Sequence, residues 1–112
     1  MNDDFPTSDY YTEYKEYSKR RLALWTSKTA ESAEIHKHER LGRAKLEKDG
    51  SNSQILDTLH IQTQDRLLNV KEKFGRMEEE LDRRWEVVKR GIQGGVSWGK
   101  VDAMERIGST GE

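Results

Sequence analysis

Pro6 is the only proline in this chain of 112 residues, so nothing from Thr7 onward blocks helix formation on proline grounds. The same stretch is rich in charge, with 37% charged and only 32% hydrophobic residues in the chain as a whole. It lacks the short alternating apolar segments, bounded by turns, that predict β-strands. We therefore expect an all-α fold made of long amphipathic helices.

The low apolar content limits how large a core the chain can build. A globular domain has roughly 45–50% apolar residues, and a small domain with fewer usually gains stability by oligomerising or by folding onto a partner. The net charge of −1, from 20 basic and 21 acidic residues, lacks the basic excess that nucleic-acid binding needs. We expect protein partners, bound by helix packing, and no nucleic acid.

Several absences bear on where the protein acts. The sequence has no cysteine, which excludes disulfides and thiolate metal sites and suits a reducing compartment. No apolar run approaches the length of a transmembrane helix, and the acidic N-terminus does not resemble a signal peptide. We expect a cytoplasmic protein with no transmembrane segment, and peripheral membrane contact stays open.

Breaks in the apolar pattern divide the chain into five expected segments. They are a polar leader (1–8), a first helix with an aromatic N-terminal end (9–48), a break (49–53), a second helix (54–93), and a Gly-rich exit and tail (94–112). Asp9 is the expected N-cap of the first helix. At the break, Gly50 suits a helix C′ position, and Ser51 with Gln54 forms a capping-box pattern.

The second helix carries a repeating apolar pattern. Steps of three and four residues from Leu67 to Leu81 are typical of a coiled coil, and Val88 continues the register. Leu56 and Leu67 lie eleven residues apart, which shifts the heptad near Gln62. The expected seam for a partner helix contains Leu56, Leu59, Gln62, Leu67, Val70, Phe74, Met77, Leu81 and Val88.

The segment Ile55–Gln62 resembles the centre of a Qb-type SNARE motif of the unanchored, SNAP-like kind. Leu56, Leu59 and Gln62 match its leucine, leucine, glutamine spacing, and the similarity extends over about residues 41–98. The resemblance implies a parallel four-helix bundle that acts in vesicle transport and membrane fusion. It also implies that Gln62 lies in the central polar layer of that bundle.

Other clusters give weaker signals. His36 and His38 point to different sides of a helix, so we expect no metal site there. The basic run at 19–21 follows acidic residues that weaken its field, and a solvated face is the simpler interpretation. Four large residues are expected to make secondary contacts: Tyr14, Leu22, Trp25 and Trp98.

Taken together, these features predict a non-catalytic helical interaction module without cofactors. Its carboxylates are numerous, but a chain this short of core material can hardly form the cleft that catalytic carboxylates need. One interpretation is SNARE-like assembly with partner helices. The alternative is a small coiled-coil adaptor or subunit that self-associates into an oligomer. The helices form either a hairpin or an extended coiled-coil rod, and the sequence leaves this choice open.

Overall fold

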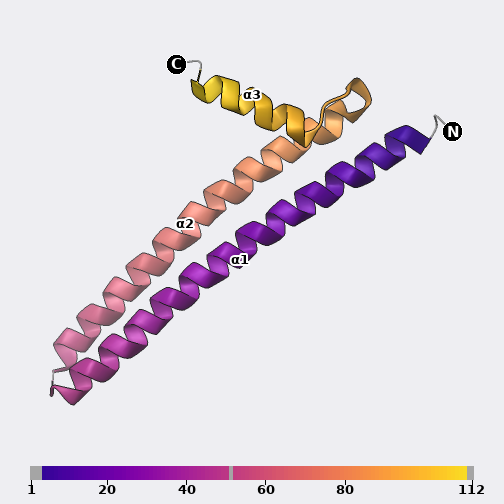
Figure 1. The fold of residues 1–112 in the computed structure, drawn as a ribbon. Helices are drawn as coiled ribbons and strands as arrows, with labels where there is room; N and C mark the ends of the chain where they lie inside the picture. Colours follow the sequence, from indigo (N-terminus) through magenta and orange to yellow (C-terminus); the bar gives the residue numbers. More distant parts are fainter. Residues whose placement is uncertain (1–3, 51, 111–112) are drawn as a thin grey trace. The chain divides into compact units, whose positions relative to one another are not determined.

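A computed structural model describes the backbone of residues 4–50 and 52–110 and the side chains of residues 10–50 and 52–105. It contains three α-helices: α1 (Asp4–Lys48), α2 (Ser53–Gly91) and α3 (Trp98–Thr110). A short 3₁₀ turn, η1 (Ile92–Gly94), follows α2, and the described residues contain no strand. The all-α prediction is confirmed (Figure 1).

The chain divides into two compact units. The hairpin unit contains residues 24–77, which are the second half of α1, the turn and the first part of α2. The terminal unit contains residues 1–23 and 78–112, which bring the start of α1 together with the end of α2, η1 and α3. Each unit has its own core, and each is described separately.

A tight turn joins the two helices of the hairpin unit. Gly50 has a φ of +77°, the left-handed conformation that glycine adopts at C′ without steric cost, and its N–H donates to the Glu47 carbonyl at 3.1 Å. The Oδ1 of Asn52 accepts a hydrogen bond from the Ile55 N–H at 3.1 Å and caps α2. The expected cap, Ser51, lies outside the described residues.

The hairpin unit is antiparallel, as three contacts demonstrate. Leu59 lies early in α2 and Gly42 lies late in α1. A Leu59 methyl carbon lies 3.4 Å from the position of a Cβ built on Gly42. His60 pairs with Glu39 at 2.9 Å, and Lys73 pairs with Glu31 at 3.0 Å. Positions further along α2 thus meet earlier positions on α1, so the hairpin alternative is the observed one.

Burial along α2 follows steps of three, four and four residues. In the hairpin unit the inward residues are Leu56, Leu59, Thr63, Leu67, Val70 and Phe74. The spacing continues in the terminal unit with Glu78, Leu81 and Trp85, and a step of three then leads to Val88. An eleven-residue repeat has about 3.67 residues per turn, close to the ~3.6 of a straight helix, so these residues stay on one side of α2.

This repeat differs from the expected heptad seam at two positions. Met77 is 42% exposed, because the four-residue step after Phe74 places Glu78 on the inner side instead. Gln62 is also exposed, and its neighbour Thr63 is the buried polar residue. The Thr63 hydroxyl donates to the Leu59 carbonyl of its own helix at 3.0 Å, so its burial leaves no polar group unsatisfied.

The terminal unit is built around Trp85. The indole of Trp85 contacts the rings of Tyr10, Tyr14 and Tyr17 on α1, with centroids 5.1–6.0 Å apart. Trp98, the first residue of α3, stacks on Trp85 with an interplanar angle of 4°. Burying such aromatic side chains contributes about 1.5–3 kcal/mol each, so this cluster carries much of the unit's stability.

Two segment boundaries differ from expectation. Helix α1 begins at Asp4, so Asp9 lies inside the helix rather than at its N-cap. The C-terminal segment, expected to be a Gly-rich exit and tail, contains the 13-residue helix α3. Gly95, with a φ of +88°, allows the reversal before α3, and the Ser97 hydroxyl accepts a hydrogen bond from the Lys100 N–H at its start.

Candidate partner-binding surface

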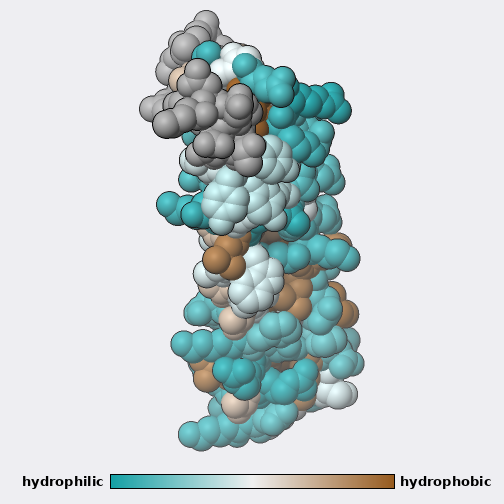
Figure 2. Space-filling model, turned by 90° about the vertical axis from the view of Figure 1, so that its right-hand side faces the viewer, coloured by the Kyte–Doolittle hydropathy of each residue, from teal (hydrophilic) through white to brown (hydrophobic). Residues whose placement is uncertain are grey.

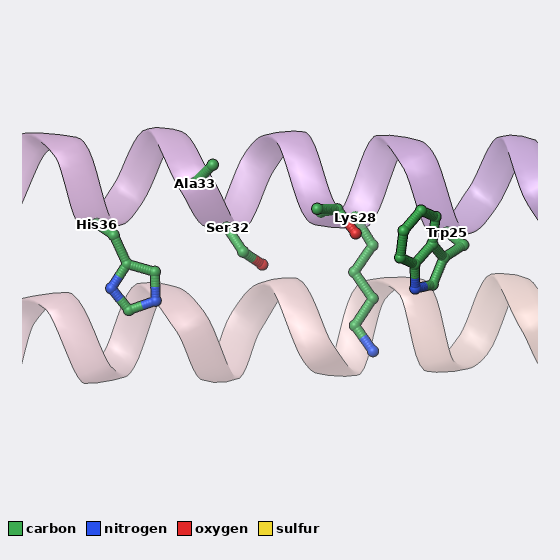
Figure 3. A pocket seen from close by; sticks show the side chains of 6 residues that line it. Trp25, Lys28, Ser32, Ala33 and His36 are labelled. Carbon is green, nitrogen blue, oxygen red and sulfur yellow. The ribbon is translucent and has the colours of Figure 1, made fainter.

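The hairpin unit has a shallow groove of about 380 Å³ along one side of α1 (Figure 3). All six lining residues come from α1: Trp25, Lys28, Thr29, Ser32, Ala33 and His36. Their spacing is helical, so one flank of α1 forms the whole groove without help from another helix. In Figure 3 the Trp25 and His36 side chains mark its two ends.

Trp25 is the unusual residue of this groove. The protein has three tryptophans, and Trp85 and Trp98 in the terminal unit are only 7% and 2% exposed. Trp25 is 64% exposed. An exposed indole keeps a large apolar surface in contact with water, and tryptophan is the residue most enriched among binding hot spots. The core of the hairpin unit therefore makes little use of Trp25, and a partner can bury it.

The polar residues of the groove are basic. Lys28 is half-buried and His36 is exposed. Neither takes part in an ion pair among the described residues, whereas Glu31 and Glu39 on the inner side of α1 are paired with Lys73 and His60. The groove thus combines one large apolar side chain with two basic groups that no described acid neutralises.

A second hollow of about 230 Å³ lies between the two helices near the turn. Its lining residues are His38, Glu39, Gly42, Leu59, Gln62, Thr63 and Arg66. The hydrogen bond from His60 lowers the pKa of the Glu39 carboxyl below its ordinary value, and the nearby Arg43 guanidinium acts in the same direction. The Glu39 carboxylate is already bonded to His60 of the same chain. We therefore interpret this hollow as part of the packing between the two helices and not as a binding site.

The histidine cluster of the sequence is divided between these two hollows. His36 lines the Trp25 groove and His38 lines the hollow beside Glu39. No group of three or more potential metal ligands occurs in the part of the chain that the structure describes. The basic run at 19–21 is also engaged, since Arg20 pairs with Glu16 and Asp102, and Arg21 pairs with Glu78 and Asp82.

Most residues of the expected partner-helix seam lie inside the chain itself. Val70, Phe74, Leu81 and Val88 are buried, and Leu56, Leu59 and Leu67 are half-buried. Gln62 and Met77 are exposed. The chain's own α1 thus covers the surface that the sequence suggested for a partner.

The expected secondary contacts also differ from one another. Tyr14 packs against Trp85, with ring centroids 6.0 Å apart, and Leu22 is exposed. Trp98 is buried, and its Nε1–H donates to the Glu13 carbonyl at 2.9 Å, so it is an internal residue. Only Leu22 and Trp25 keep most of their surface free for another molecule.

Sequence reasoning missed Trp85, the central residue of the terminal unit. The heptad register passes through Arg84 and leaves Trp85 beside the seam. The signal that identifies Trp85 is the eleven-residue spacing from Thr63 through Phe74. Leu56 and Leu67 show the same eleven-residue step, and adding that step to Phe74 predicts Trp85 as an inward residue.

Two further features of the molecule are the polarity of its surface and the apolar character of its helices. Figure 2 shows a face that is mainly hydrophilic, with hydrophobic side chains in small separate islands. No helix among the described residues combines the length and the apolar character that crossing a membrane requires. Comparisons with protein-family models, with curated proteins and with solved structures find no match to this chain.

Proposed function

We propose that this protein is a non-catalytic helical interaction module that binds a partner helix at the Trp25 groove. The observation that carries the proposal is the exposure of Trp25 in a groove formed by α1 alone. The inner residues of α2 are already covered by the same chain, so they hold the module together. The Trp25 flank remains exposed in the hairpin unit and is available for recognition.

Site-specific photo-cross-linking tests this proposal. A photoreactive amino acid replaces Thr29, which lines the groove, or Glu34, an exposed residue outside it, and the protein is irradiated in extract of its source cells. We expect a discrete partner to be captured from position 29, and the Trp25→Ala variant to lose that product. Equal capture from both positions, or capture that is independent of Trp25, contradicts the proposal.

A self-associating adaptor is the second candidate function. Ile61 and Leu68 favour it, since both are more than half exposed and lie seven residues apart on one outer side of α2. A second copy of the chain would bury them as a short coiled-coil contact. Light scattering tests this candidate: the wild-type mass should rise with concentration, and the double variant Ile61→Gln/Leu68→Gln should stay monomeric.

The SNARE-like role stays a prediction. It requires the inner residues of α2 to leave α1 and pack against partner helices, with Gln62 in a central layer. Mixing the protein with SNARE-motif peptides tests this directly. A new complex that needs Gln62 would support the role, and an unchanged spectrum and mass would remove it.

A further inference from the structure

We infer that the occupant of the Trp25 groove is an acidic amphipathic helix, one that carries carboxylates beside a short apolar face. The inference rests on the proposed function and adds the chemistry of the partner. It depends on three properties of the groove, which are its charge, its length and the backbone that forms it.

The charge of the groove favours an acidic partner. Lys28 and His36 are its only ionisable lining residues, and no described acid pairs with either. Of the neighbouring acids of α1, Glu31 and Glu39 are paired with Lys73 and His60 from α2, and Glu34 does not line the groove. A carboxylate brought by a partner therefore meets an uncompensated cation, and a lysine or arginine meets repulsion at the same place. Charge complementarity of this kind selects partners and orients them.

Trp25 and His36, at the two ends of the groove, are eleven residues apart, so the groove spans about three helical turns. Lys28 and His36 are eight residues apart, which places their Cα atoms about 12 Å apart at ~1.5 Å per residue. A partner helix with two carboxylates at a similar separation can contact the Lys28 ammonium and the His36 imidazole at once. Its apolar face then covers the Trp25 indole, and the small side chains of Ser32 and Ala33 leave room for larger partner residues.

The backbone of the groove favours a helix over an extended peptide. An added β-strand binds through unpaired backbone groups at the edge of a sheet. The groove lies in the interior of α1, where the N–H and carbonyl groups are bonded within the helix, so an extended peptide finds no main-chain partners. Side-chain packing of an amphipathic helix remains as the mode of binding.

Two synthetic helical peptides with the same apolar face provide the test. One carries glutamate at two flanking positions eight residues apart, and the other carries glutamine there. Each is titrated into the full-length protein while the Trp25 indole N–H resonance is followed by NMR, with Trp25→Phe used for its assignment. We expect the glutamate peptide to shift this resonance and to bind about fivefold more tightly than the glutamine peptide, with the advantage shrinking at high salt.

Charge reversal supplies the matched control. The double variant Lys28→Glu/His36→Glu should prefer a lysine version of the peptide, and Lys45→Glu, at an exposed position outside the groove, should keep the original preference. Equal binding of the glutamate and glutamine peptides overturns the inference, and so does a failure of every peptide to shift Trp25. A larger Trp25 shift with anionic lipid vesicles than with either peptide also overturns it, in favour of a membrane surface. A Trp25-dependent cross-link from position 29 would then still support the proposed function.

Discussion

At the scale of single residues, the buried Trp85 stabilises the fold, whereas the exposed Trp25 contributes little to it. Trp85 contacts three tyrosines and Trp98, so Trp85→Ala removes a buried ring and should lower the free energy of unfolding by about 3–5 kcal/mol. Trp25→Ala, at an exposed position, should change it by less than about 0.5 kcal/mol. Urea unfolding measures both. Similar losses in the two variants would show that Trp25 belongs to the core.

Two glycines of α2 provide another matched pair. A Cβ on Gly91 would lie 2.5 Å from the Val96 Cγ2 and 2.7 Å from its Cβ, so Gly91→Ala must push the chain after α2 away from the helix end. A Cβ on Gly75 meets nothing within 4 Å, and alanine there improves helix propensity. We expect Gly91→Ala to lower the melting temperature and Gly75→Ala to raise stability by about 0.5–1 kcal/mol. Thermal unfolding followed by circular dichroism tests both, and the opposite order would contradict the close contact with Val96.

Glu39 makes the stability of the hairpin unit dependent on pH. Its pKa is lowered in the folded state, chiefly by the hydrogen bond from His60, so its carboxylate stabilises the fold above the unfolded pKa of about 4.3. That stabilisation is lost as the pH falls through the lower folded pKa. The stability difference between wild type and Glu39→Gln should therefore shrink on acidification below about pH 5. Chemical unfolding at several pH values measures it.

The control for this pH effect is Glu47→Gln. Glu47 is an exposed carboxylate near the end of α1, in no ion pair among the described residues. Its removal should leave the acid dependence close to that of wild type. A difference between wild type and Glu39→Gln that stays constant with pH would mean that the contact with His60 does not form.

At the scale of elements, α3 is held by a few polar contacts around one buried ring. Arg20 donates two hydrogen bonds to the Asp102 carboxylate, at 3.1 and 2.7 Å, and its guanidinium lies over Trp98. The hydrogen bond to Asp102 is also the main reason that the pKa of Arg20 is raised. Arg84 forms a further ion pair with Glu105.

These contacts predict that α3 opens more easily than the helices it packs on. Arg20→Gln should increase hydrogen exchange of the α3 amides and leave the amides of the hairpin unit unchanged, because the lost partner, Asp102, belongs to α3. Lys19→Gln, at an exposed neighbouring position, is the control. Equal acceleration in both units would mean that Arg20 supports the whole chain rather than α3.

The helices themselves were predictable from the sequence, because their signals are local. The lack of proline after Pro6 and the polar break around Gly50 are enough to predict two long helices with a turn. Helix α3 was missed because Gly94, Gly95 and Gly99 suggest an unstructured exit, whereas Trp98 stabilises a helix there by packing on Trp85. Trp98 also donates a hydrogen bond to the Glu13 carbonyl, 85 residues away in the sequence, and a contact of that range leaves no local pattern.

The candidate site was only partly predictable. Trp25 was recognised as a contact residue, yet nothing in the sequence of α1 indicates which of its sides faces α2. The inner side of α1 in the hairpin unit carries Lys28, Glu31 and Glu39 as well as Leu24 and Ile35, so hydrophobicity alone does not identify it. The pairs of Glu31 with Lys73 and of Glu39 with His60 mark the side of α1 that faces α2, and Trp25 is exposed.

At the scale of the whole molecule, our central claim is that one chain covers its own helical seam and leaves the Trp25 groove to a partner. The buried residues Val70 and Phe74 of the hairpin unit, and Leu81 and Val88 of the terminal unit, support the first half of this claim. Ion pairs between helices add a small contribution to this packing within each unit.

Far-UV circular dichroism of the isolated protein over a wide concentration range, with the mass measured in parallel, tests this claim most directly. We predict high helicity at the lowest concentration, where the protein is monomeric, and no gain in helicity as the concentration rises. Low helicity in the monomer, increasing only with self-association or with an added partner, would contradict the account. It would show that the α2 seam depends on a helix from another chain.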